Sequence, residues 1–284
     1  MGAKPRRPSR ASTTLAGRVR RLSSALAKRA DPETKAWWER YLRGVIGFHG
    51  VRMATIRREL HRWIQSERAR APLTTPDERL LATMLMQQPL AEDKLAGILF
   101  IQEVLLPDGR IIWRRDLASM ATLFDDGSIA DWNTCDWFCV KVLGLMVVRD
   151  GEPCARSIAA WSRADNLWRR RASVVAFVNL AKHGEDHFPG FTDLLLESCQ
   201  VLITSSERFA QTGAAWVIRE LSLADPDRVA TFLRSNLTSL SRESVRSATA
   251  KMSVHLKTEL REEHEVATSM NRTRFGSDVD AGTP

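Results

Sequence analysis

The feature that most constrains this chain is a helical hydrophobic period that runs through almost its whole length. Apolar residues recur at i, i+3, i+4 and i+7, and no segment shows the alternating pattern of a half-buried strand. We therefore expect an all-α fold. The predicted helices span residues 33–46, 52–69, 76–88, 91–105, 111–124, 128–148, 154–163, 167–183, 191–203, 206–223, 226–236 and 242–256.

Capping residues and first-turn prolines mark several of the predicted helix starts, as at Asp31-Pro32 and Asp225-Pro226. Because the connections are short, successive helices should fold back on one another as antiparallel hairpins. Hairpins that repeat every roughly 35 to 45 residues are typical of HEAT-like solenoids. We expect a curved solenoid with a concave groove, a shape suited to a peptide, a protein partner or a DNA duplex.

The positive charge is concentrated at the N-terminus. The net charge is +8, but residues 1–30 contain nine Lys and Arg and no acid, which leaves residues 31–284 with one net negative charge. We interpret residues 1–30 as a basic, partly disordered extension: a DNA-contacting arm, a solvated first helix with an unstructured lead, or an organellar transit peptide. Residues 31–261 form the predicted folded domain, and the polar residues 262–284 a disordered tail.

Other features narrow the class of protein. No apolar run reaches the roughly 18 residues of a membrane span, and the four cysteines form no disulfide framework. The chain lacks a phosphate-binding glycine loop, a G-x-S-x-G elbow and an H-E-x-x-H motif. We expect a monomer in the bacterial cytosol or nucleoid, with no membrane contact, no metal and no cofactor.

Two predicted helices carry a charged residue on an otherwise apolar face. The i, i+4 spacing puts Trp132, Asp136 and Val140 on one stripe, and Arg171 shares a face with Val174. Burying an unpaired charge is costly, so each charge needs a partner or a cleft. Arg171 is the expected partner of Asp136, and a buried structural ion pair is the alternative to a functional site.

Three ordered segments resemble the AlkD-type family of DNA alkylation repair glycosylases. The family patterns are W-x-x-x-D, S-D-N-x-W-x-x-R-A and K-A-[IL]-x-W-x-[IL]-R-E. The resemblance covers roughly residues 37–250. The matching segments are Trp132-Asn-Thr-Cys-Asp136, Trp161-Ser-Arg-Ala-Asp-Asn-Leu-Trp-Arg-Arg-Arg171-Ala and Gln211-Thr-Gly-Ala-Ala-Trp216-Val-Ile-Arg219-Glu220.

The resemblance implies a role for each matching side chain. Asp136 would be the catalytic carboxylate, Trp132 and Trp216 would contact the deoxyribose of the lesion, and Arg171 would orient nearby groups. Tyr41, the one tyrosine, would support the cleft. Affinity would come from arginine contacts to phosphates. For Arg58, Arg62 and Arg170 a solvated face is an equally good explanation, whereas Arg57 and Arg219 lie inside matching segments. The candidates are Arg57, Arg58, Arg62, Arg170 and Arg219.

The sequence also departs from the family pattern. Asn133 stands where members often have Asp, Ala54 where proline is common, and Ala164 where the second segment has Ser. Residues 212–214 replace K-A-[IL] by Thr-Gly-Ala, which removes a lysine that would contact a phosphate.

The implied function is the excision of cationic N3- and N7-alkylated purines from duplex DNA in base excision repair. Such a base is already a good leaving group, so a carboxylate need only stabilise the oxocarbenium-like sugar and position a water. Two alternatives stay open: an inactive relative that binds unusual or branched DNA, and a HEAT-type scaffold that binds proteins.

Overall fold

The computed structural model describes the backbone of residues 14–276 and the side chains of residues 14–270. The described chain is helical and contains no strand, only an isolated bridge between Gly47 and Leu90. It divides into two compact units, one ending at Val142 and the other beginning at Leu143. The expected all-α fold is therefore confirmed, whereas residues 1–13 of the extension that we expected to be partly disordered lie outside the described residues.

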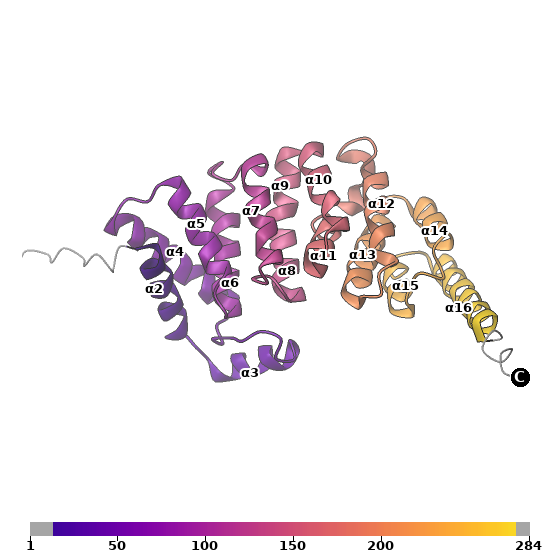
Figure 1. The fold of residues 1–284 in the computed structure, drawn as a ribbon, viewed down its shortest axis with the longest axis horizontal. Coiled ribbons are helices and arrows are strands. Elements are labelled where there is room, and N and C mark those ends of the chain that lie inside the picture. The colour runs from indigo at the N-terminus through magenta and orange to yellow at the C-terminus, as the bar shows by residue number, and fades with distance from the viewer. Residues whose placement is uncertain (1–13, 277–284) are drawn as a thin grey trace, which may run out of the picture. The chain divides into compact units, whose positions relative to one another are not determined.

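The first unit is built around α6, all of whose residues are buried. This helix packs on α4, α5 and α8. Figure 1 shows α3 below the lower ends of α2 and α6. Seven α-helices and one π-helical turn of the described chain lie within this unit: α2 Leu15–Ala27, α3 Pro32–Tyr41, α4 Met53–Arg70, α5 Thr75–Met86, α6 Ala91–Phe100, η1 Ile101–Leu105, α7 Trp113–Asp125 and α8 Trp132–Phe138. The π-helical turn η2 Cys139–Leu143 follows α8.

The second unit is built around α13, which packs on α11, α12 and α15. The final helix α16 packs on α14 and α15. The helices are α9 Gly144–Asp150, α10 Glu152–Ala159, α11 Leu167–Val175, α12 Phe191–Ile203, α13 Arg208–Leu221, α14 Pro226–Arg234, α15 Arg242–Ala248 and α16 Val254–Gly276, with the short 3-10 helices η3 Ala160–Arg163 and η4 Ala181–Asp186.

The basic N-terminal segment is packed into the first unit. α2 buries Val19, Leu22 and Leu26, and it contacts α4, α5 and α6. Residues 15–27 thus form the first helix of one of the three interpretations, but this helix is packed rather than solvated, because one face of the amphipathic segment is apolar enough to join the core. Residues 1–13 lie outside the described part of the chain.

The C-terminal expectation also needs correction. The predicted helix 242–256 is two helices, and α16 continues through Gly276, where we expected disorder from residue 262. Leu260 and His264 are buried, and the His264 ring lies 2.9 Å from the Leu240 carbonyl oxygen. The helix was not predicted because α16 has too few apolar residues to show a clear hydrophobic period. Residues 277–284 lie outside the described residues.

Two other predicted helices end early. The predicted helix 33–46 stops at Tyr41, since Arg43 and Gly44 have φ angles of 52° and 72° that break the right-handed turn. The predicted helix 167–183 stops at Val175.

None of the helices from α2 to α16 combines the length and apolar composition that a membrane span needs.

Candidate functional site

One group of predicted site residues lies in the first unit, where α8 begins. The Asp131 carboxylate caps α8 by accepting a hydrogen bond from the Thr134 amide at 2.8 Å, which fixes the start of the helix at Trp132. Tyr41 meets Trp132 edge-to-face, with ring centroids 5.2 Å apart and an interplanar angle of 73°. Asp136 is half-buried and lies one turn further along α8, on the side of Trp132.

Trp132 is held by a small apolar cluster. It packs with Trp38 and Ile46 against the buried side chains of Leu42 and Phe48. Because this cluster joins the segment after α3 to α8, the structure brings together Tyr41 and Trp132, which are far apart in the sequence.

A buried carboxylate fixes the segment that follows α3. Glu92, 1% exposed, accepts hydrogen bonds from the backbone amides of His49, Gly50 and Val51 at 2.8, 2.7 and 2.9 Å. A buried carboxylate needs hydrogen-bond partners, and the three backbone amides supply them for Glu92. The next residue, Asp93, lies 3.1 Å from the His49 ring. Glu92 and Asp93 thus attach the segment carrying Phe48 to α6.

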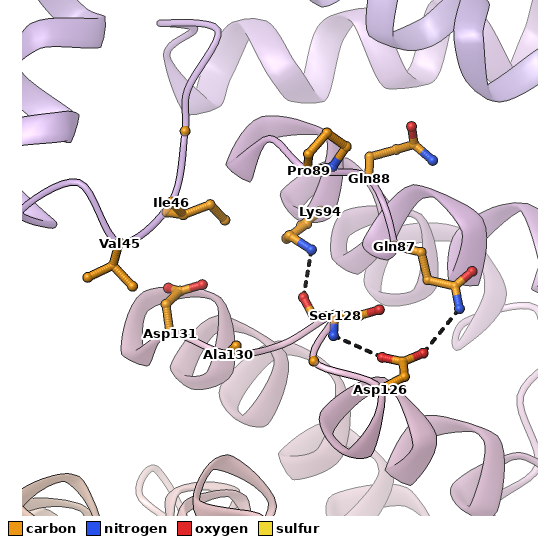
Figure 2. Close-up of a pocket in the computed structure, with 12 residues that line it drawn as sticks. Val45, Ile46, Gln87, Gln88, Pro89, Lys94, Asp126, Ser128, Ala130 and Asp131 are labelled. Carbon is orange, nitrogen blue, oxygen red and sulfur yellow. Dashed lines mark hydrogen bonds between the residues drawn. The ribbon is translucent and has the colours of Figure 1, made fainter.

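A buried lysine fixes the loop that leads into α8. Lys94 Nζ donates to the carbonyl oxygens of Met86 at 2.9 Å and Ser128 at 2.6 Å. Burial lowers the pKa of Lys94, while the nearby carboxylate of Asp131 acts in the opposite direction. Figure 2 shows the hydrogen bond between Lys94 and Ser128, which both line a pocket. The pocket has a volume of about 450 Å³, and its lining includes Asp131, the residue before Trp132.

A separate group of predicted site residues lies in the second unit, where α11 packs on α13. Arg171 is buried, and its Nη1 donates to the Phe209 carbonyl oxygen at 2.8 Å and the Thr212 hydroxyl at 3.3 Å. A Cβ at Gly213 would lie 3.2 Å from this guanidinium, so glycine lets the two helices approach closely. Thr212 and Gly213 are departures from the family pattern, and the structure gives both a contact with Arg171.

Trp216 and Arg219 lie further along α13. Trp216 is half-buried, one turn beyond Thr212, and the Arg219 guanidinium is 6.0 Å from its ring centroid. Arg219 also donates to Glu220, which accepts a second bond from Lys251 at 2.5 Å. Burial would raise the pKa of Glu220, but the hydrogen bonds from Lys251 and Arg219 lower it.

The arginines expected to bind phosphates are all engaged with neighbouring groups. Arg57 donates to Glu103 at 2.6 Å, Arg170 pairs with Glu207, and Arg62 pairs with Glu59 at 3.1 Å. Arg58 donates to a threonine hydroxyl at 3.2 Å. A phosphate at Arg57, Arg170 or Arg219 would have to compete with a carboxylate, so these contacts stay predictions.

The expected pairing of Asp136 with Arg171 joins residues of different units, and it too stays a prediction. Three residues that were not predicted from the sequence hold the site residues of the first unit: Trp38, Glu92 and Lys94. For Glu92 and Lys94 the sequence contained an indication, because three consecutive charged residues, Glu92 to Lys94, begin a helix that is otherwise mostly apolar.

Comparison with known proteins gives a family and a fold. Residues 22–252 match the family model described as DNA alkylation repair enzyme. A solved structure, the predicted DNA alkylation repair enzyme from Enterococcus faecalis, is similar at 18% sequence identity with a TM-score of 0.65. The match covers 80% of this chain and 98% of that one, so the two share a fold. No curated protein matches this chain.

Proposed function

Since this chain belongs to the DNA alkylation repair enzyme family, we propose that it is a DNA glycosylase that excises cationic N3- and N7-alkylated purines from duplex DNA. The observation that supports this most directly is the position of Asp136. Its carboxylate is half-buried, one helical turn from Trp132, whose ring is held by Tyr41 and the apolar cluster beneath.

The proposed reaction needs few catalytic groups from the protein, because the alkylated base is already a good leaving group. An N-alkylated purine carries a positive charge and leaves as a neutral base, so the glycosidic bond breaks toward an oxocarbenium-like sugar. The Asp136 carboxylate stabilises that positive charge and accepts a proton from the water that attacks the sugar carbon. The Trp132 ring adds cation-π attraction to the same sugar.

The second unit contributes Arg171 and Trp216 to this proposal. Arg171 acts as a positioning residue, because its bonds to Phe209 and Thr212 hold α11 against the turn of α13 that precedes Trp216. The resemblance assigns Trp216 a contact with the deoxyribose, and this role stays a prediction. Arg57, Arg170 and Arg219 exchange their carboxylate partners for DNA phosphates, which predicts binding that weakens steeply with salt.

The decisive experiment measures release of 7-methylguanine and 3-methyladenine from methylated duplex DNA. We expect Asp136→Asn to slow release by about 100-fold, since one electrostatic partner of the transition state is lost. The matched control is Asp125→Asn, which neutralises an exposed carboxylate at the end of α7 and should release both bases at the wild-type rate.

Equal rates for wild type and Asp136→Asn would refute the role of this carboxylate. A folded wild-type protein that binds DNA in a salt-dependent manner but releases neither base would refute the glycosylase. That result would favour a relative that binds unusual DNA structures without releasing a base.

A further inference from the structure

Trp37 and Tyr41 form an exposed aromatic surface on α3. Their rings stack with centroids 5.1 Å apart and 15° between the ring planes, and each residue is 50% exposed. We propose that this pair, the α3 platform, stacks against an unpaired nucleobase of DNA beside the damaged nucleotide. The inference rests on the proposed function in taking damaged DNA as the ligand.

Trp37 is not needed to hold α3 in place. The neighbouring Trp38 does this, because its ring stacks on the buried Phe48 with centroids 5.6 Å apart and 12° between planes. Burying a large aromatic side chain stabilises a fold, and Trp37 and Tyr41 lose half of this stabilisation because half of each residue stays exposed to solvent. Exposed apolar side chains that pack against each other, as Trp37 and Tyr41 do, mark interaction sites.

The platform is continuous with the candidate site. Tyr41 stacks on Trp37 on one side and meets Trp132 edge-to-face at 5.2 Å on the other. A nucleotide whose sugar lies against Trp132 would therefore bring its neighbours in the strand toward Trp37.

The charges around the platform favour DNA over a protein partner. Arg40 and Arg43 flank it, are exposed, and form no ion pair with any residue that the structure describes. In contrast, the nearby Glu39 lies 3.8 Å from Lys35. Aromatic side chains next to uncompensated cations are the combination that binds single-stranded DNA, where rings stack on bases and cations contact the backbone.

The platform should discriminate between paired and unpaired DNA. In a duplex both faces of each base are covered by its neighbours, so an indole has no face to stack on unless a nucleotide is unpaired. We therefore expect tighter binding to a duplex that contains one unpaired nucleotide than to the fully paired duplex.

The test uses the full chain and a duplex with one unpaired 2-aminopurine, whose fluorescence is quenched by stacking. We expect Trp37→Ala to weaken binding of this duplex by about 10-fold and to abolish the quenching. Trp37→Phe, which keeps a ring, should retain most of both. The control is Trp113→Ala, which removes a half-buried indole from α7 that also lies beside an arginine, with the Arg114 guanidinium 4.5 Å from its ring centroid.

Three outcomes would overturn the platform: no preference of the wild type for the unpaired nucleotide, an unchanged Trp37→Ala variant, or equal losses on the paired and unpaired duplexes. The salt dependence of binding should not change in Trp37→Ala, because stacking releases no counterions. Base release measured in parallel separates the two proposals. Quenching of 2-aminopurine without base release would support the platform and refute the glycosylase. Base release without quenching would support the glycosylase and refute the platform.

Discussion

The neighbouring helices α2 and α3 use arginine and apolar side chains in opposite ways. α2 buries its apolar face and pairs Arg18 and Arg21 with the buried carboxylate of Glu67. α3 buries none of its residues and leaves Trp37 half exposed beside arginines that have no acidic partner among the described residues. Counting basic residues therefore does not identify a DNA-binding surface. An arginine that is already paired with a buried carboxylate is not free to bind a phosphate.

The largest expected effect is on the α2 side of this comparison. Glu67 is 1% exposed, accepts two hydrogen bonds from Arg21 at 2.6 Å, and lies 3.4 Å from the buried Arg18. Glu67→Gln leaves Arg18 buried without a counter-charge, so we expect the free energy of unfolding to fall by about 3 kcal/mol. Urea denaturation measures this.

The control for Glu67→Gln is Glu33→Gln, which removes an exposed carboxylate from α3. It should change the free energy of unfolding by no more than about 0.5 kcal/mol. Similar losses in the two variants would show that α2 and α3 do not differ in how their charges are used.

A smaller effect is expected where the segment after α3 is anchored to α6. The hydrogen bond with Asp93 raises the pKa of His49 above its ordinary 6.5, although burial opposes it. The folded protein thus binds this proton more tightly than the unfolded chain. The contribution to stability is complete below about pH 6.5 and is lost as pH rises through the raised folded pKa.

His49→Gln keeps a donor but cannot titrate. We expect it to lower the free energy of unfolding by about 1.5 kcal/mol at pH 6 and by less at pH 8. Urea denaturation across this range measures the difference. The control is His255→Gln on α16, because the His255 side chain is 91% exposed. A loss that is the same at both pH values would mean that the proton at His49 does not anchor this segment.

The smallest expected effect separates stability from binding at the end of α3. Arg43 has a φ of 52°, a left-handed conformation that costs a non-glycine residue about 1–2 kcal/mol. Arg43→Gly relieves this strain, and the greater freedom of glycine in the unfolded chain offsets part of the gain, so we expect a net stabilisation of about 0.5 kcal/mol. DNA affinity should fall, because the charge beside the platform is lost.

The contrasting substitution is Arg40→Gly, inside the last turn of α3. It should destabilise the protein by about 1 kcal/mol in thermal or urea unfolding, since glycine disfavours the helix. A destabilised Arg43→Gly variant, or one with unchanged DNA affinity, would contradict the proposed division between fold and binding.

Local patterns in the sequence predicted much of this protein. The predicted helix 191–203 coincides with α12, and the Asp31-Pro32 signal correctly marked the start of α3. The placement of Trp132 and Asp136 on one helix also follows from spacing alone. These features depend on residues within a few positions of each other, where the period of a helix and the chemistry of its caps decide the outcome.

Other features depended on contacts between distant residues. Arg21 and Glu67 are 46 positions apart, and nothing in the basic N-terminal segment indicated that a buried carboxylate would bind its arginines. The length of α16 and the exposure of Trp37 were also missed. A hydrophobic period shows which residues can face a core, but the tertiary structure decides which of them are covered and which charges are neutralised.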